Sequence, residues 1–384
     1  MDLLPPIYSE AEVPDYKLPA LGDHKKTLQL FADNVYGHAP SAIPRFRIEV
    51  VEEDNAALCG VAHRLQLRVT LFSEGVRSYF NLLVYTPAAT SHAVPLFLGL
   101  NFYGNHTIHA DPAIVLPESW CPDDKTKGVV DHRATEAGRG VQATRWPVEM
   151  LLKLGYGLAT VYCGDFAPDD PDHVHEGVLA FYKTAGTPET RGGAISAWAW
   201  GLSRAMDLLA ALPDVDAGHV AVIGHSRLGK AALWAGACDE RFAMVISNNS
   251  GCTGAALARR RIGERLVHIN GQFPHWFAKH YHTFDEREQD LPVDQQQLLA
   301  LVAPRALYVA SASEDLWADP RGEYLALAAA AAAWNLQLPA DPPPMEAPLH
   351  TGSLGYHIRS GPHGITPYDW LQYITFADRV LFPE

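Results

Sequence analysis

Cysteine, basic side chains and long apolar runs are all scarce in this sequence. The five cysteines are odd in number and form no C-x-x-C pair, so they indicate neither a structural zinc site nor a complete disulfide framework. Lysine and arginine number 30 against 44 acidic residues, and the net charge of −14 disfavours binding to nucleic-acid phosphates or anionic membranes. No apolar run reaches the 18 residues typical of a membrane-spanning helix. We therefore expect a neutral or sugar-like partner, with no nucleic acid and no membrane.

What the chain does have is the composition of a folded protein with a sizeable core. Hydrophobic residues make up 48% of it and charged residues 19%. Residues 1–45 carry many prolines and little periodicity, which predicts an extended N-terminal arm, and residues 46–384 show no break in composition, which predicts a single catalytic domain. The first six residues lack a basic and an apolar segment, so no secretory signal is visible. The compartment stays open between cytoplasmic and secreted with a signal removed, and so does the oligomeric state.

Apolar runs of strand length alternate with helical patterns along most of the chain. Residues 46–86 predict antiparallel edge strands, because apolar and polar side chains alternate there. Further strands are predicted at 94–100, 157–162, 219–223, 244–247 and 306–310, and helices at about 194–212, 324–334 and 368–380. Strands that alternate with helices predict an α/β fold, a three-layer αβα sandwich with a mostly parallel central sheet.

The most informative stretch leads from an apolar strand through Gly224 and Ser226 directly into a helix. In a nucleophile elbow a serine sits on a strained strand-to-helix turn, which exposes its hydroxyl beside the first N–H groups of the helix. The common elbow has a second glycine two residues after the serine. Here Leu228 stands at that position and Gly229 follows it, so the generic pattern is only partly met. We interpret Ser226 as a catalytic nucleophile; the structural alternative is an ordinary serine at a helix N-terminus.

A serine hydroxyl needs a base, and the base needs an acid that fixes its tautomer. In α/β-hydrolases the acid follows the serine in the chain, on a loop after a later strand. The strand 306–310 ends in such an acidic loop, where we nominate Asp315 as the acid, with Glu314 and Asp319 as rivals. The structural alternative is a solvated loop carboxylate.

The base is expected nearer the C-terminus. His363 lies in Gly-Pro-His-Gly, where small neighbours favour a turn that holds the imidazole in an open cleft. We therefore predict His363 as the base. His350 and His357 are closer in sequence to the acid, but they lack this frame, and we expect them at the surface.

Stabilising an oxyanion requires preorganised donors. The N–H group of Arg227 is one natural donor, and its guanidinium is a second, charged one; the alternative is a solvated residue in the first helical turn. The polar stretch 101–106 follows a predicted strand where many esterases carry another oxyanion loop, and it is otherwise a plain polar turn. Lys230 shares a helix face with Ser226, although a lysine there is by itself an ordinary solvated side chain.

No metal or other cofactor is predicted. The close histidine pairs are His106 with His109, His173 with His175, and His280 with His282. None of these pairs has a clear third ligand, so we interpret them as surface histidines.

These residues match a known family. The segment Gly-His-Ser-Arg-Leu-Gly-Lys at 224–230 resembles the G-C-S-R-x-G-K signature of the glucuronoyl esterases, carbohydrate esterase family 15, with His225 in place of the usual cysteine. The likeness continues through segments 249–255, 259–264, 272–277 and 314–320 and through His363, so it covers roughly residues 90 to 380.

The resemblance implies an α/β-hydrolase that works without a metal. Members of the family cleave the ester between a 4-O-methyl-glucuronic acid side chain of xylan and an alcohol of lignin. By that resemblance Ser226 is the nucleophile, His363 the base and Arg227 the oxyanion-stabilising arginine. The positions that resemble the family's sugar-binding residues are Lys230, Glu264, Gln272 and Trp317. Their chemistry is suitable, because lysine, carboxylate and amide groups bind hydroxyls and an indole packs on a sugar ring.

One position departs from the family pattern. Many members have a catalytic glutamate directly before Ser-Gly, where this chain has Asn249, which cannot act as an anionic partner of histidine. The acid role should therefore fall to Asp315. Two alternatives remain: an acetyl xylan or other carbohydrate acyl esterase, and a hydrolase-fold carbohydrate-binding protein without turnover.

Overall fold

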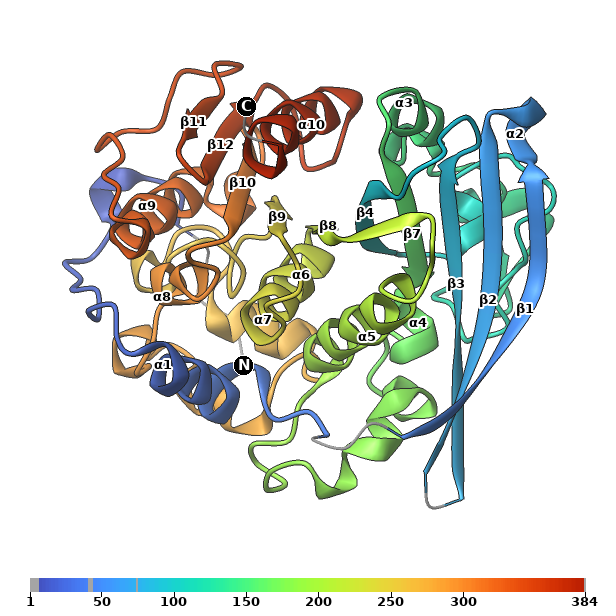
Figure 1. The fold of residues 1–384 in the computed structure, drawn as a ribbon. Coiled ribbons are helices and arrows are strands. Elements are labelled where there is room, and N and C mark those ends of the chain that lie inside the picture. Colours follow the sequence, from blue (N-terminus) through green and yellow to red (C-terminus); the bar gives the residue numbers. More distant parts are fainter. Residues whose placement is uncertain (1–6, 41–43, 74, 383–384) are drawn as a thin grey trace. The chain divides into compact units, whose positions relative to one another are not determined.

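The computed structural model describes residues 7–40, 44–73 and 75–382 (Figure 1). The chain divides into two compact units. The first unit comprises Met1–His38, Gly186–Ser196 and Val222–Glu384, and the second comprises Ala39–Ala185 and Ala197–Ala221. One strand, β8 (Val215–His225), begins in the second unit and ends in the first.

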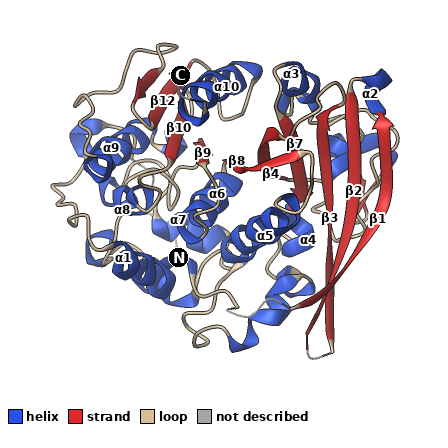
Figure 2. Cartoon of the chain, in the orientation of Figure 1, coloured by secondary structure: helices blue, strands red, loops and turns tan. Residues whose placement is uncertain are grey.

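The second unit is built on strands in the order β1-β2-β3-β7-β4, followed by the start of β8 (Figure 2). Its strands are β1 (Arg45–Ala56), β2 (Ala62–Ser73), β3 (Val76–Pro87), β4 (Val94–Asn101) and β7 (Gly157–Tyr162). Its helices are α2 (Ala57–Gly60), α3 (Val148–Lys153), α4 (Cys163–Phe166) and most of α5 (Ala194–Leu209), and a short pair β5 (Val129–Val130) and β6 (Arg133–Ala134) stands apart from the main strands. The strands β1, β2 and β3 pair antiparallel, which confirms the predicted antiparallel edge between residues 46 and 86. β4 and β7 pair parallel.

The first unit continues from the end of β8 in the order β9-β10-β12-β11. Its strands are β9 (Met244–Asn248), β10 (Ala306–Ala312), β11 (Leu349–Thr351) and β12 (Leu354–Arg359). Its helices are α1 (His24–Phe31), α6 (Arg227–Cys238), α7 (Leu266–Gln272), α8 (Gln295–Ala300), α9 (Pro320–Ala330) and α10 (Pro367–Leu381). β10 runs parallel to both β9 and β12, and only β11 is antiparallel to its neighbour.

Burial explains why these segments become strands and helices. Every residue of β9 and β10 is buried, as expected for parallel strands covered on both faces. α6 is buried from Leu228 to Ala237, and its run of alanine and glycine allows close packing: a Cβ on Gly236 would lie 2.4 Å from a methyl carbon of Val245 on β9. The structure thus confirms the predicted α/β class and its mostly parallel central sheet.

The N-terminal segment differs from its prediction. Residues 24–36 are helical, as α1 and a following π-helical turn, so the prediction of an extended arm is wrong there. Asp23 caps α1, because its carboxylate accepts a hydrogen bond from the backbone N–H of Lys26 at 2.9 Å. The buried ring of Tyr36 stacks on Trp234 of α6 with the centroids 4.6 Å apart. Residues 1–6 and 41–43 lie outside the described residues, and the boundary at residue 45 stays a prediction.

None of the helices within the described ranges is long and apolar enough to cross a membrane.

Candidate active site

Ser226 stands at the sharp turn between β8 and α6. Its backbone has φ 57° and ψ −130°, a combination that L residues rarely adopt. Gly224 makes the turn possible, because a Cβ at that position would lie 1.9 Å from the carbonyl oxygen of Leu228. The backbone N–H of Ser226 donates to the carbonyl oxygen of Asn248 at the end of β9. The local geometry is that of a nucleophile elbow, with the glycine two residues before the serine fixed by close packing.

Asp315 and His363 meet although 48 residues separate them. Nδ1 of His363 lies 2.6 Å from Oδ2 of Asp315, whose residue is only 6% exposed. The amide nitrogen of Asn249 donates to the same aspartate oxygen at 3.1 Å. Asn249 therefore positions the carboxylate instead of supplying one. A histidine whose Nδ1 faces a carboxylate keeps its Nε2 available as a base.

Arg359, at the end of β12, holds the loop that carries His363. Its guanidinium donates to the carbonyl oxygens of Ser360, Pro362 and Gly364 at 2.8–2.9 Å. Backbone bonds also join this loop to the loop of the acid, since the N–H of Glu314 donates to the carbonyl of Gly361 at 3.0 Å. Arg359 could not be predicted from the sequence, because no local motif marks a side chain that folds back over the loop that follows it.

Arg359 belongs to a buried polar network. Its Nε donates to Asp369 on α10, and the other oxygen of that carboxylate lies 2.9 Å from Nε2 of His357. Burial opposes ionisation of Asp369, yet the hydrogen bond with His357 and the charge of Arg359 hold its pKa below the ordinary value. His357 is fully buried, so the prediction that it lies at the surface is wrong. It stands on β12, an inner strand, and its side chain pairs with Asp369, which is also buried.

The same network reaches the back of the elbow. Nδ1 of His225 lies 2.7 Å from the side-chain oxygen of Asn248, whose amide nitrogen donates to the hydroxyl of Tyr373. The ring of His225 packs against that of His363, with the centroids 4.5 Å apart. His225, which stands where the family has a cysteine, therefore packs against His363, the predicted base.

The structure brings all of the predicted site residues together around one cavity of about 370 Å³ in the first unit. They are Ser226, Arg227, Lys230, Glu264, Gln272, Asp315, Trp317 and His363. The remaining lining comes from residues that the sequence analysis did not place in the site, namely Asn249, Ser250, Gly251, Phe273, Trp276 and Ala318. Phe273 and Trp276 stack with centroids 3.8 Å apart; both lie in segment 272–277, which carries part of the family likeness, but neither was assigned a role from the sequence.

Lys230 and Glu264 form the buried side of the cavity. Nζ of Lys230 donates to the carbonyl oxygens of Ser250 and Cys252 at 2.5 and 2.7 Å, and lies 3.9 Å from Oε2 of Glu264. Burial raises the pKa of Glu264, against the weaker opposing effect of Lys230 and of a hydrogen bond with the side chain of Trp317. The alternative of a solvated lysine does not hold, because Lys230 is 4% exposed and fastens a loop.

The two rival acids occupy other positions. Asp319 is buried, binds Nε of Arg260 at 2.8 Å and caps α9 through the N–H of Gly322. Glu314 is exposed. Among the described residues, Asp315 is the one carboxylate of these three that forms a hydrogen bond with a histidine.

A buried carboxylate supports the loop that follows β9. Glu323 of α9 accepts a hydrogen bond from the N–H of Gly251 at 2.9 Å and contacts the hydroxyl of Ser311 at 2.6 Å. Full burial raises the pKa of Glu323 to about 8. Lys230 and Glu323 therefore hold the peptide group between Ser250 and Gly251 from both sides, in the loop that also carries Asn249.

The polar stretch 101–106 forms a turn within the second unit. The amide of Asn101 donates to the side-chain oxygens of Asn105 and Thr160, and its own oxygen accepts from the N–H of Gly104. The role of this stretch as an oxyanion loop stays a prediction. Among the described residues, no group of three or more histidine, cysteine or acidic side chains is placed to hold a metal ion.

Known proteins share the sequence and the fold. The family model for fungal glucuronyl esterase matches residues 150–337. The carbohydrate esterase MZ0003, from an unknown prokaryotic organism, is 44% identical over 97% of this chain and 91% of its own length. A glucuronoyl esterase structure from Solibacter usitatus has a TM-score of 0.88 and 41% identity, over 96% of this chain and 99% of that one. The 4-O-methyl-glucuronoyl methylesterase of Hypocrea jecorina is 34% identical, but only over 40% of this chain and 35% of its own length.

The fold and these relatives define a carboxylic ester hydrolase of the α/β-hydrolase fold. More narrowly, the chain belongs to the glucuronoyl esterases, carbohydrate esterase family 15. The resemblance drawn from the motifs is thereby confirmed.

Proposed function

We propose that this protein hydrolyses the ester between a glucuronic acid side chain of xylan, with or without its 4-O-methyl group, and an alcohol of lignin. The names of the relatives support the uronate ester, and the single observation that carries the mechanism is the cavity that gathers Ser226, Arg227, His363 and Asp315. Its other walls hold groups suited to a sugar, which are a lysine, a carboxylate, an amide and an indole.

In the proposed first step, Oγ of Ser226 attacks the carbonyl carbon of the ester while Nε2 of His363 takes the hydroxyl proton. Asp315 holds Nδ1–H of the imidazole and stabilises the imidazolium that forms. The former carbonyl oxygen becomes an oxyanion, which the N–H and guanidinium of Arg227 stabilise. When the intermediate collapses, the bond to the alcohol breaks and His363 returns the proton to the departing oxygen.

In the second step water is the nucleophile and the serine oxygen is the leaving group. A water molecule gives its proton to His363 and attacks the glucuronoyl ester on Ser226, and the proton then returns to Oγ as the serine is released. The product is a free glucuronate, whose carboxylate the guanidinium of Arg227 balances. A cation at this place favours substrates whose acid product stays on the sugar.

The sugar contacts divide by chemistry. Lys230 has two of its three donors on loop carbonyls, which leaves one for a ligand or for Glu264. Trp317 is 38% exposed and offers its ring to the face of a pyranose. Gln272 ends α7 at the exposed rim, where an amide can both donate to and accept from sugar hydroxyls.

Steady-state kinetics with the benzyl ester of glucuronic acid and with an acetylated xyloside test the proposal. We expect the glucuronate ester to be cleaved with the higher kcat/KM, and Ser226→Ala to lose at least about 10³-fold in kcat. Cleavage of the acetyl ester alone would establish the acyl esterase alternative. No turnover of either ester by a folded protein would establish the carbohydrate-binding alternative.

A further inference from the structure

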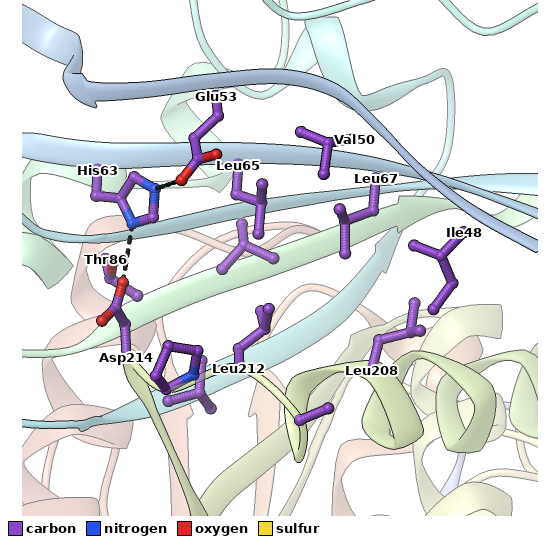
Figure 3. A pocket seen from close by; sticks show the side chains of 14 residues that line it. Ile48, Val50, Glu53, His63, Leu65, Leu67, Thr86, Leu208, Leu212 and Asp214 are labelled. Carbon is purple, nitrogen blue, oxygen red and sulfur yellow. Dashed lines mark hydrogen bonds and ion pairs between the residues drawn. The ribbon is translucent and has the colours of Figure 1, made fainter.

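A second cavity, of about 350 Å³, lies among residues of the second unit (Figure 3). One wall is the face of the β1–β3 strands, where Leu65 pairs across the strands with Val84 and Leu67 lies beside them. The opposite wall comes from the end of α5 and the residues after it, including Leu208 and Leu212. The volume falls within the range of small-molecule sites, and the lining is mostly aliphatic.

One end of this cavity is polar and carries excess negative charge. His63 lies between two carboxylates, with Nδ1 3.0 Å from Oδ2 of Asp214 and Nε2 3.2 Å from Oε1 of Glu53 (Figure 3). One imidazole faces two carboxylates here, and even a positive charge on the ring would offset only one of the two negative charges, so this end of the cavity is net negative. Both carboxylates are about half exposed, so a ligand can reach their other oxygens from solution.

A β-bulge places Glu53 at this end. In a regular strand the face of Ile48 and Val50 would continue with residue 52. The register of β1 shifts between Val50 and Glu52, so that Glu53 is the residue opposite Leu65 and lines the cavity. Glu52 instead binds Arg64, which is not part of the cavity. Bulges that redirect one side chain are frequent next to functional sites.

The rim of the cavity leaves apolar surface in water. Ile48 and Val50 line it, yet they are 44% and 61% exposed, and both belong to the edge strand β1. A ligand seated between them and the leucines of α5 would remove this apolar surface from water, at roughly 25 cal/mol per Å².

We propose that this cavity is a second ligand site, separate from the residues of the active site, which takes a small hydrophobic cation. The compact aryl or branched alkyl part would pack among Leu65, Leu67, Val84 and Leu212, and an ammonium group would bind the carboxylate oxygens of Glu53 and Asp214 that His63 does not contact. The charge at the polar end argues against an anionic ligand such as a fatty acid, and the net charge of −14 acts in the same direction.

Three probes of one shape and different head groups test the assignment: 4-phenylbutylammonium, 4-phenylbutan-1-ol and 4-phenylbutyrate. Binding is measured by titration calorimetry at low salt and located by shifts of labelled leucine and valine methyl signals. We expect the ammonium to bind at least about tenfold more tightly than the alcohol, as a charge-assisted bond predicts, and the carboxylate to bind most weakly. The shifted signals should be those of Leu65, Leu67, Val84 and Leu212.

Variants separate the head-group contacts from the apolar ones. Glu53→Gln combined with Asp214→Asn should remove the preference for ammonium and leave the binding of the alcohol unchanged. Val50→Lys should weaken binding of the ammonium probe at least tenfold, because the ammonium group of the introduced lysine reaches the mouth of the cavity and repels the cationic probe. Val130→Lys, at an exposed valine of β5 outside this lining, is the matched control and should bind as the unmodified protein does.

Equal binding of the three probes, no binding at all, or shifts confined to methyl groups outside the lining of this cavity would overturn the proposal. An equal loss with Val50→Lys and Val130→Lys would overturn it as well. Because none of these residues lies in the catalytic cavity, hydrolysis of the glucuronate ester by each variant reports that the protein is folded.

Discussion

His363 and Asp315 form a 2.6 Å contact between an imidazole nitrogen and a carboxylate oxygen. The imidazole is 42% exposed and the carboxylate 6% exposed, so one partner faces the cavity while the other is fixed in the protein. This division suits a base that exchanges protons with a substrate and an acid that only orients it.

We predict that Asp315→Asn lowers kcat for the glucuronate ester by about 10³- to 10⁴-fold, because an asparagine no longer favours the Nδ1–H tautomer. KM should change little, since Asp315 lies behind the histidine. Asp319→Asn is the control in the same loop. It breaks a bond to Arg260 and should reduce the free energy of unfolding while leaving kcat within about threefold. Similar values of kcat for the two variants would contradict the assignment of the acid.

Arg359 should act on both stability and rate. In Arg359→Gln the carbonyls of residues 360–364 lose their common donor and Asp369 loses its cation. We expect the free energy of unfolding to fall by about 3 kcal/mol and kcat to fall in the folded fraction. Denaturant titration and kinetics below the transition measure the two effects. Arg321→Gln breaks an exposed ion pair and should change stability by less than about 1 kcal/mol. An unchanged kcat in folded Arg359→Gln would show that the clamp does not position His363.

Trp317 should contribute to binding more than to chemistry. Removing its ring in Trp317→Ala should raise KM about threefold to tenfold and leave kcat within about threefold, because the ring packs on the sugar equally before and during the reaction. Leu316→Ala is the matched control, since Leu316 is adjacent and exposed but does not line the catalytic cavity. A higher KM for both variants would attribute the effect to the loop and not to the indole.

Glu323 should make stability depend on pH. Its pKa is about 8 in the folded protein and about 4.5 when unfolded, so the folded state holds one more proton between these values. Its contribution to stability is therefore fully present below pH 4.5 and is lost as the pH rises to about 8. Glu323→Gln should flatten the pH dependence over this range, because the amide carries no titratable proton and keeps an acceptor for the N–H of Gly251.

Thermal unfolding of both proteins between pH 5 and 8.5 measures this effect. The exposed Glu314→Gln is the control and should follow the unmodified protein. Parallel pH curves for Glu323→Gln and the unmodified protein would mean that Glu323 is ionised in the folded state.

The meeting of Ser226, Asp315 and His363 at one cavity could be predicted because each residue has a local signal. Gly224 and Ser226 sit at a strand end followed by a helix, Asp315 follows a buried apolar strand, and His363 lies in a turn of small residues. Chain order then assigned their roles. The same signals placed most strands of the α/β fold, since buried parallel strands read as apolar runs.

What the sequence did not reveal depends on contacts between distant segments. The strand β12 carries His357 and Arg359, whose buried partner, Asp369, lies on the following helix; without that partner His357 was expected at the surface and Arg359 was not singled out. At position 249 the sequence showed only that an asparagine replaces the family's glutamate. The hydrogen bond from Asn249 to Asp315 depends on the ends of β9 and β10 lying side by side. The helix α1 lies in a proline-rich segment of weak periodicity, and its N-terminal cap, Asp23, was not recognised from the sequence.

The central claim is that Ser226 is the nucleophile for glucuronate ester hydrolysis. The most direct measurement treats the protein with a fluorophosphonate, follows loss of activity on the benzyl ester of glucuronic acid, and maps the adduct by peptide mass. We predict one adduct, on Ser226, that appears in step with the loss of hydrolysis. Full hydrolysis with Ser226 completely labelled, or complete loss with the adduct on another residue, would contradict the account.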